Sequence, residues 1–446
     1  MVLLKERMGW RSESRLRNSG PNQTNTGRYP LPLTARQWRN RLRILTHFPE
    51  SSVIKYRRHL NPLLSNSFFL FGARGTGKTS LLREIFAGDP PAEILRHDLL
   101  DPETEERLAL NPALLRSEIK LKRPSWVIID EIQKLPGLLN VVHSIIEDPD
   151  IPNIHFALTG SSARKLKRAG INLLAGRAFV YHLFPLTHLE IGKDFDLNEA
   201  LQWGTLPKVT LLDGKREKTL FLRAYSNTYL KEEIWAEHLV DKLEPFRRFL
   251  PICAQMSGEI LNYSTIARDV GVHDKTIKTY YQILEDTLVG FFLEPFHHSL
   301  RKRQKKSPKF FLFDTGITRS LQGNLSIELV KGSFDYGKAF EQWLIGEFHR
   351  LSSYQEDDAK FSYLDTGNAE IDLIIERPGA RTALIEIKSR SRTTLADAKH
   401  LIGLRQDFAS ADCFVLSQDK VQRVEDGVYF LPWDEGIMRL GFTGAC

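Results

Sequence analysis

Residues 68–79 read FFLFGARGTGKT, an apolar run followed at once by a glycine-rich segment. The segment has the pattern G-x-x-x-x-G-K-T of a phosphate-binding loop, and the residues behind it, SLLREIF, have helical periodicity. Glycines let the backbone curl so that its N–H groups point at phosphate oxygens, and the helix N-terminus adds positive potential. We expect Lys78 to reach the β- and γ-phosphates of ATP and Thr79 to ligate Mg²⁺. The predicted nucleotide-binding residues of this loop are Gly72, Gly75, Gly77, Lys78, Thr79 and Ser80.

A second apolar run, WVIIDE at 126–131, ends in two acids. Ligands of open α/β sheets bind at the carboxyl ends of the strands, which is where these acids stand. We expect Asp130 to hold the magnesium shell and Glu131 to orient or deprotonate the attacking water. Together with the phosphate-binding loop, the pair predicts hydrolysis of ATP and not only its binding.

The pattern around these motifs predicts a parallel sheet. From about residue 65 to 190 short apolar runs alternate with helix-like stretches, which is typical of a sheet covered by helices. One further run, HFALTGSS at 155–162, ends in hydroxyl side chains. A polar side chain there can sense the γ-phosphate, and a Ser/Thr turn or a helix N-cap explains the same residues.

The composition excludes several classes of protein. With 446 residues, 42% of them hydrophobic, and a formal charge of +7, the chain is long enough for several globular domains. Its longest apolar runs fall far short of the roughly 18 residues of a membrane-spanning helix, and no secretory signal stands out. Cys253, Cys413 and Cys446 are too far apart for a zinc site and odd in number for a disulfide framework. We therefore expect a cytoplasmic protein without a membrane partner.

Residues 1–50 are predicted to form a basic, mostly flexible arm. Residues 1–60 hold 13 Lys and Arg against Glu6, Glu13 and Glu50. The stretch 11–35 is rich in Ser, Asn, Gly and Pro, which cannot bury enough apolar surface to fold alone. A solvated tail and a nucleic-acid contact both fit this charge, and a transit peptide fits less well because of the acids.

The order of the motifs resembles a known family. GARGTGKT, WVIIDEIQKLP, FALTGSS, LLAGR, FPLTHLE and WGTLP follow one another as in the AAA-type ATP-binding proteins that carry a C-terminal winged helix and a PD-(D/E)xK nuclease-like domain. The resemblance covers nearly everything after residue 50. It implies an α/β fold with a P-loop AAA-type parallel sheet core at 51–205, a helical lid and winged-helix domain at 206–325, and an α/β nuclease-like domain at 326–446.

The resemblance implies two further roles. Arg177, in LLAGR, occupies the place from which AAA-type ATPases reach into a neighbour's nucleotide and stabilise the transferring phosphoryl group. The alternative is an arginine that caps a helix C-terminus. Gly204 and Pro207, in WGTLP, resemble a turn that packs against adenine, although a plain turn explains them as well. ATP sites between subunits imply a homo-oligomer, and we expect a ring.

A helix-turn-helix pattern occupies 263–287, with GVH at 271–273 as the turn. Its second helix exposes polar groups that can reach phosphates or base edges. The run RKRQKK at 301–306 lies between two strand-like runs and predicts a wing with a basic tip, suited to counterion release. Winged helices also dock proteins, and basic runs are often only solvated. The predicted DNA contacts are Lys275, Thr276, Lys278, Arg301, Lys302, Arg303, Lys305 and Lys306.

Three carboxylates and a lysine are expected to meet in the C-terminal segment. Glu341 lies on a predicted helix, Asp372 on a strand, and Glu386 and Lys388 on one face of the next strand, because side chains in a strand alternate. Asp372 and Glu386, with the carbonyl of Ile387, can hold Mg²⁺, or Mn²⁺ in its place. Lys388 would orient or help deprotonate the attacking water, and Glu341 could steer the hydrated metal.

This arrangement resembles the PD-(D/E)xK nucleases, whose core runs helix, three strands, helix, strand. Ile371 stands where the name-giving motif has a proline. The alternative is that Glu386 and Lys388 form a surface ion pair of little energetic value. Their apolar flanks, ALI and Ile387, instead favour a central strand with its charges in a cleft.

The sequence thus predicts an ATPase that acts as an oligomeric DNA-processing motor. It would bind duplex or branched DNA rather than RNA, and cut it as a metal-dependent endo- or exonuclease. The runner-up is a nucleotide switch, or a branch-migration or translocation motor, that binds DNA or a protein partner without cleaving. Metal-dependent cleavage separates the two hypotheses.

Overall fold

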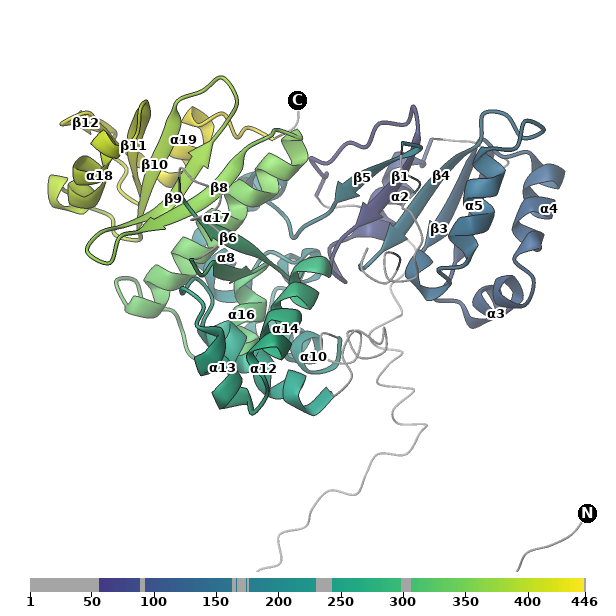
Figure 1. Ribbon diagram of the computed structural model, residues 1–446, viewed down its shortest axis with the longest axis horizontal. Coiled ribbons are helices and arrows are strands. Elements are labelled where there is room, and N and C mark those ends of the chain that lie inside the picture. Colours follow the sequence, from purple (N-terminus) through teal and green to yellow (C-terminus); the bar gives the residue numbers. More distant parts are fainter. Residues whose placement is uncertain are drawn as a thin grey trace, which may run out of the picture. The chain divides into compact units, whose positions relative to one another are not determined.

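The computed structural model describes residues 56–88, 93–162, 166, 174, 176–229, 243–297 and 306–444 (Figure 1). The predicted arm at 1–50 lies outside these ranges, and so do the predicted DNA contacts Arg301, Lys302, Arg303 and Lys305. Within the described ranges no helix is both long enough and apolar enough to cross a membrane.

The predicted parallel sheet is present and has five strands in the order β2-β3-β4-β1-β5 (Figure 1). They are β1 (Ser67–Phe71), β2 (Ile94–Asp98), β3 (Trp126–Asp130), β4 (His155–Gly160) and β5 (Ala178–His182). The central strands β1 and β3 are buried at every position, which explains their unbroken apolar runs. Sequence reasoning missed β2, because ILRHD alternates buried and exposed residues at the edge of the sheet.

Helices cover both faces of this sheet. Alternate residues of β1 enter different apolar clusters: Phe69 and Phe71 pack with side chains of the helices between β2 and β4, and Phe68 and Leu70 pack with Leu81 of the helix after the glycine-rich segment. The helices of this part are α2 (Lys78–Ile85), α3 (Pro102–Leu110), α4 (Ala113–Lys122) and α5 (Leu138–Ile146). A parallel sheet buried on both sides is the α/β architecture that the sequence predicts.

The middle of the chain is mostly helical and has one core of its own. Its elements are α7 (His188–Ile191), α8 (Leu197–Trp203), α9 (Pro207–Thr210), α10 (Lys215–Ala224), α12 (Leu243–Gln255), α13 (Tyr263–Val270), α14 (Asp274–Asp286) and α16 (Thr315–Gln322). Between α13 and α14, Gly271 has a φ of 76°, which favours glycine and ends α13. Two strands, β6 (Gly290–Pro295) and β7 (Lys309–Leu312), form an antiparallel pair at the expected positions.

The C-terminal sheet is mixed and contains eight strands in the order β12-β13-β11-β10-β9-β8-β6-β7. They include β8 (Lys360–Asp365), β9 (Glu370–Glu376), β10 (Thr382–Lys388), β11 (Ala411–Ser417), β12 (Arg423–Glu425) and β13 (Val428–Pro432). Strand β6 pairs with β7 on one side and, at Glu294 and Pro295, with β8 on the other. The β6–β7 hairpin is therefore continuous with the sheet that carries Asp372, Glu386 and Lys388.

Further elements complete this region. The strands β12 and β13 and the helix α19 (Trp433–Arg439) follow β11, beyond the helix, three strands, helix and strand that the resemblance implies. Between β10 and β11 the chain forms α18 (Lys399–Leu404) between two short 3-10 turns, Leu395–Ala398 and Arg405–Asp407.

The longest helix, α17 (Phe334–Gln355), carries Glu341 in its first half. It is buried along most of its length, which explains why its hydrophobic residues do not form a single stripe. In its second half, Tyr354 packs among the side chains of β1 and β3. The same helix thus contacts both sheets.

His349 on α17 makes the stability of this packing depend on pH. Its ring stacks on Phe291 with 4.2 Å between ring centroids. Burial, followed by the charges of His182 and Arg350, lowers the pKa of His349 to about 4 from its ordinary value of 6.5. Because the folded-state pKa is depressed, the stabilisation is complete above pH 6.5 and is lost as the pH falls toward 4.

We expect acidification from pH 7 to pH 5 to cost about 1–2 kcal/mol of folding free energy through this residue. Thermal unfolding at the two pH values measures the loss. His349→Phe should reduce the difference between them, whereas His400→Phe, at an exposed position, should not. An equal pH dependence of the parent and His349→Phe would contradict this assignment.

Candidate functional site

The glycine-rich segment joins β1 to α2 in a loop that only glycine can form. Gly75 and Gly77 have φ values of 80° and 98°, and a Cβ on Gly72 would lie 2.5 Å from the carbonyl oxygen of Leu183. The Lys78 ammonium donates to the carbonyl of Gly72 at 2.8 Å, and Thr79 and Ser80 are exposed at the start of α2. The loop, its lysine and the helix N-terminus therefore have the arrangement that a nucleotide phosphate requires.

The two acids at the end of β3 lie beside this loop. The hydroxyl of Thr79 donates to Asp130 Oδ2 at 2.7 Å, so these two oxygens already face each other as ligands of one Mg²⁺ would. Glu131 has a φ of 58°, and its carboxylate lies 3.9 Å from the Lys78 ammonium. A hydroxyl and a carboxylate form a donor set that suits Mg²⁺.

The hydroxyl residues at the end of β4 and just after it support these acids. Thr159 donates to Asp130 and accepts the main-chain N–H of Glu131 at 3.1 Å. Gln133 donates to Glu131 and, at 3.0 Å, to the hydroxyl of Ser161. Thr159 and Ser161 thus position the acids at the strand ends, and Gln133 is a residue that sequence reasoning did not single out.

Asp98 is a third acid at this edge and was also missed. It ends β2 and is paired in register with Asp130. Burial raises the pKa of Asp98 above its ordinary value, the N–H of Leu100 opposes this, and the charges of Asp130 and Glu131 add to it. Acids that crowd together at one edge of a sheet are a feature of a cation-binding site. Asp98 was missed because the strand β2 was not predicted from the sequence.

Arg177 lies at the start of β5, the edge strand next to β1. Because Ser67 pairs with Ala178 and Phe71 with His182 in parallel, Arg177 is at the opposite end of the sheet from the loop of its own chain. Its side chain is 40% exposed and forms an ion pair with Glu147. It cannot serve its own nucleotide from this position, so its predicted role in a neighbour's site stays a prediction.

Gly204 and Pro207 have different surroundings. A Cβ on Gly204 would lie 2.0 Å from the carboxylate of Asp314, and this carboxylate accepts the N–H of Thr205 at 2.8 Å. Close packing thus explains the glycine. Pro207 begins α9, and its Cγ would lie 3.9 Å from a Cβ on Gly77, so it is close to the glycine-rich loop. Its adenine contact remains a prediction.

Arg58 connects the loop to α17, and sequence reasoning gave no sign of it. Its guanidinium donates to the carbonyl of Thr76 at 2.6 Å, to Glu190 at 2.8 Å and to the hydroxyl of Tyr354 at 2.9 Å. Burial alone would lower the pKa of Arg58, but the partners Tyr354 and Glu190 raise it above its ordinary value. The buried cation therefore fixes one end of α17 against the loop.

A second buried contact holds the same end of α17. Glu347 accepts the main-chain N–H of His188 at 2.7 Å and lies 3.4 Å from the guanidinium of Arg350. Burial would raise the pKa of Glu347, but Arg350 and His188 lower it below its ordinary value. Arg350 also donates to the hydroxyl of Thr205 at 3.0 Å.

The four predicted residues of the C-terminal segment come together. Lys388 and Glu386 form an ion pair on one face of β10. On the adjacent strand β9, Asp372 accepts the main-chain N–H of Ile387 at 2.7 Å. Glu341 on α17 interacts electrostatically with Asp372. Glu386 is 6% exposed, so the alternative of a surface ion pair does not describe this site.

The carboxylates of this cluster are shielded from water and lie close to one another. Burial, and then the charge of Asp372, raises the pKa of Glu341 to about 7 and that of Glu386 to about 8. Glu341 Oε1 and Glu386 Oε2 are buried and have no hydrogen-bond partner among the described residues. Within those residues no group of three or more Asp, Glu, His or Cys side chains could hold one ion, so a metal would take further ligands from the main chain and water.

Two lysines outside the predicted set enter the same cluster. Lys309, at the start of β7, lies 2.5 Å from Glu370 and 3.6 Å from Glu341, and only 4% of it is exposed. Lys338 lies 4.0 Å from the other oxygen of Glu341 and 2.6 Å from Glu259. The sequence around either lysine does not predict these contacts, because the fold brings each lysine to partners that are distant in the chain.

The helix pair α13–α14 presents the groups predicted to contact DNA. Ile277, Tyr281 and Leu284 are buried, whereas Lys275 and Lys278 are exposed and Thr276 is half-buried. The ammonium of Lys278 lies 5.2 Å from the centre of the Tyr263 ring. Lys306 donates to the carbonyl of Asp365, the last residue of β8, at 3.0 Å.

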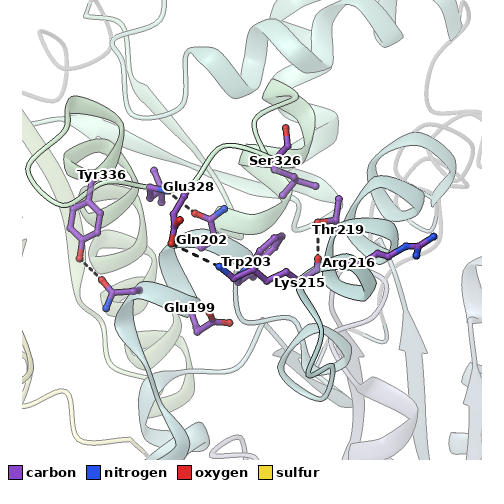
Figure 2. Close-up of a pocket in the computed structure, with 12 residues that line it drawn as sticks. Glu199, Gln202, Trp203, Lys215, Arg216, Thr219, Ser326, Glu328 and Tyr336 are labelled. Atoms are coloured by element: carbon purple, nitrogen blue, oxygen red, sulfur yellow. Dashed lines mark hydrogen bonds and ion pairs between the residues drawn. The ribbon is translucent and has the colours of Figure 1, made fainter.

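An open cleft of about 300 Å³ lies apart from these residues, between α8, α10 and the segment before α17. Figure 2 shows Glu328 facing Lys215 across it, with 3.9 Å between the charged atoms. None of the residues predicted to bind nucleotide, metal or DNA lines this cleft.

Comparisons with known proteins give a separate family-model match for each of three parts of the chain. Residues 65–192 match the family model described as AAA domain, residues 194–328 match Domain of unknown function (DUF8612), and residues 336–435 match Domain of unknown function (DUF4143). The first match and the loop geometry assign an AAA-type P-loop ATPase domain, which binds ATP, to the N-terminal part. The second and third carry no assigned function.

Relatives and solved structures resemble larger parts of the chain. An uncharacterized protein of Mycobacterium tuberculosis is 26% identical over 335 residues, which are 74% of this chain and 73% of the relative. An uncharacterized protein of Methanocaldococcus jannaschii is 21% identical over 335 residues, 69% of this chain and 71% of the relative.

Two solved structures give weaker likenesses. The replication initiator DnaA bound to AMPPCP and single-stranded DNA aligns with 49% of this chain and 82% of its own at 16% identity and a TM-score of 0.26. The Thermotoga maritima RuvB Holliday junction branch migration motor aligns with 55% and 84% at 15% identity and a TM-score of 0.25. Likenesses of this degree do not define a fold.

Proposed function

We propose that this protein is an oligomeric ATPase that binds DNA and cuts it with a magnesium-dependent nuclease domain. The observation that carries the nuclease part is the cluster of Glu341, Asp372, Glu386 and Lys388, in which Glu386 is buried, the other three are half-buried, and two carboxylate oxygens have no hydrogen-bond partner among the described residues. An AAA-type P-loop domain in the same chain supports the ATPase part.

A divalent cation fits between Asp372 and Glu386. Burial, the largest cause, raises the pKa of both carboxylates, and one oxygen of Glu386 has no hydrogen-bond partner among the described residues, so a bound cation would stabilise their charged forms. These two carboxylates and the Ile387 carbonyl would hold Mg²⁺ or Mn²⁺. When bound, the ion polarises the scissile phosphodiester and stabilises the charge that develops on it. Lys388, on the face of β10 that carries Glu386, holds the attacking water.

ATP hydrolysis would use the residues around the glycine-rich loop. Lys78 leaves the Gly72 carbonyl and binds the β- and γ-phosphate oxygens, while Thr79 and Asp130 hold the Mg²⁺ that accompanies the nucleotide. Glu131 orients the attacking water. The carboxylate of Glu131 lies 3.9 Å from the Lys78 ammonium, which supports a role for both groups at one γ-phosphate.

DNA would bind along the middle and C-terminal parts of the chain. We infer that α13, α14 and the β6–β7 hairpin form a winged helix whose exposed Lys275 and Lys278 contact phosphates. The contact of Lys306 with the end of β8 supports this assignment, since β8 pairs with the strand β9 that carries Asp372. Phosphate contacts of this kind give affinity without sequence specificity.

The proposal of an oligomer rests on the predicted role of Arg177 in a neighbour's site. We expect Arg177→Ala to keep ATP binding but to lower turnover about 10³-fold or more, because an arginine supplied to a neighbour's site acts on the transition-state charge. ATP binding by equilibrium titration and turnover by phosphate release measure the two separately. Arg123→Ala, at the end of α4, is the matched control and should behave as the parent. Unchanged turnover in Arg177→Ala would contradict a role between subunits.

The DNA part is tested by ATP turnover with and without linear duplex, single-stranded and branched DNA. We expect duplex or branched DNA to raise turnover several-fold and to bind more weakly as salt increases. Turnover that responds to none of the three, together with no salt-dependent binding, would contradict the DNA part and leave the ATPase part standing.

A second candidate function is a nucleotide switch without cleavage. The observation that favours it is Arg58, which donates both to the loop carbonyl of Thr76 and to Tyr354 on α17, the helix that carries Glu341. A change in the loop on ATP binding could thereby shift α17 and a partner surface. DNA that stays intact while ATP alters binding of a partner would select this function.

A further inference from the structure

The ammonium group of Lys309 is buried in a cluster of carboxylates. The residues next to Lys309 in the sequence do not indicate this position. Lys309 begins β7, in the hairpin, yet lies 2.5 Å from Glu370 of β9 and 3.6 Å from Glu341 of α17. Burying an ammonium costs several kcal/mol unless opposite charges compensate it. Three elements that are distant in the sequence therefore meet around this one cation.

The cluster divides into two halves. In the first, Glu341 and Glu370 face Lys309, with Lys338 at 4.0 Å from Glu341. The second half contains Asp372, Glu386 and Lys388. Burial alone would lower the pKa of Lys309, but Glu341, Glu370 and Asp372 raise it above its ordinary value, so Lys309 stays charged throughout the physiological range.

The two halves differ in how firmly their ammonium groups are enclosed. Lys309 pairs with both Glu341 and Glu370 and its side chain is 5% exposed, whereas Lys388 pairs with Glu386 and its side chain is 28% exposed. A dication entering the first half would meet Lys309 within a few ångströms, and two like charges at that distance repel strongly in a buried site. In the second half the ammonium group is that of Lys388, which reaches solvent and can turn away from an entering ion, and Glu386 has an oxygen without a hydrogen-bond partner among the described residues.

We propose that Lys309 is the resident cation of the Glu341–Glu370 half, so that the cluster takes a single divalent ion, between Asp372 and Glu386, and not a pair. The proposal rests on the proposed nuclease function and makes it more specific. Lys309 is a positioning residue here. Its ammonium, which is part of the chain itself, occupies the place that a second metal ion holds in a two-metal site. The hairpin that begins at β6 thereby contributes directly to the metal site.

The test is the number of Mn²⁺ ions bound per chain, measured by calorimetry and by electron paramagnetic resonance without nucleotide. Every sample is the full chain with Asp130→Asn, so that the nucleotide site binds no Mn²⁺ and does not add to the number of bound ions. We expect one ion in this reference protein, none in the additional Asp372→Ala variant, and two in Lys309→Met, because the freed Glu341 and Glu370 then bind an ion. Lys338→Met, at the more exposed lysine, is the matched control and should keep one ion.

Further variants keep the outcome decisive if Lys309→Met folds poorly. Glu341→Gln should keep one ion, since the ion lies in the other half, and Lys309→Arg should also keep one. Two ions in the reference protein, one ion in a folded Lys309→Met, or loss of the ion in Glu341→Gln would overturn the role of Lys309. If the reference protein binds no ion but Lys309→Met gains one that Glu341→Gln removes, the role of Lys309 stands and the nuclease proposal fails.

Discussion

Replacing Lys78 by alanine is expected to lower ATP turnover by at least about 100-fold, because the lysine supplies the charge that stabilises the transferring phosphoryl group. The ammonium is buried in the loop, 2.8 Å from the Gly72 carbonyl and 3.9 Å from Glu131, so its removal leaves the phosphates without this cation. Phosphate release at saturating ATP measures the loss.

The matched control for this substitution is Lys193→Ala, at an exposed position outside the loop. It should turn over ATP at the parent rate, and both variants should unfold at similar temperatures. Normal turnover by Lys78→Ala would mean that the glycine-rich loop does not bind the phosphates of ATP, and the assignment of Thr79 and Asp130 to Mg²⁺ would fail with it.

Replacing Lys388 by methionine is expected to reduce DNA cutting by at least about 100-fold and to leave ATP turnover unchanged. Lys388 shares a face of β10 with Glu386 and forms an ion pair with it, so it would lie next to both the metal and the attacking water. Methionine keeps the length of the side chain and removes the charge. Gel analysis of end-labelled DNA and phosphate release are measured on the same preparations.

Lys360→Met is the control for Lys388, because Lys360 lies at the exposed start of β8 in the same sheet. It should cut DNA as the parent does. If Lys388→Met also cuts at the parent rate, the nuclease site lies elsewhere in the chain, and the burial of Glu386 serves stability or binding alone.

The nucleotide site could be predicted from the sequence because its parts are local. The residues from Gly72 to Thr79 are contiguous, and Asp130 lies beside them because the strands β1 and β3 end at the same edge of the sheet. The period of two in a strand likewise predicted that Glu386 and Lys388 share a face. In both cases the regular geometry of the backbone allows the spacing of residues in the sequence to predict where their side chains lie.

The residues that were missed all depend on contacts across the fold. Arg58 reaches Tyr354, almost three hundred residues away, and Lys309 reaches Glu370 from another element. The alternating pattern of β2 hid Asp98, and β6 pairs with both β7 and β8, which its sequence does not indicate. Such contacts give no periodic pattern in the sequence, because the partners of each residue are distant in the chain.

The most direct measurement of the central proposal is the cutting of labelled linear duplex, single-stranded and branched DNA by the parent protein. Mg²⁺ or Mn²⁺ is supplied, each with and without ATP, and EDTA is the control. We predict metal-dependent fragments from duplex or branched DNA that Lys388→Met does not produce, and a change in their yield when ATP is present. Intact DNA on all three substrates with either metal would contradict a nuclease, and the switch held together by Arg58 and α17 would then be the better account.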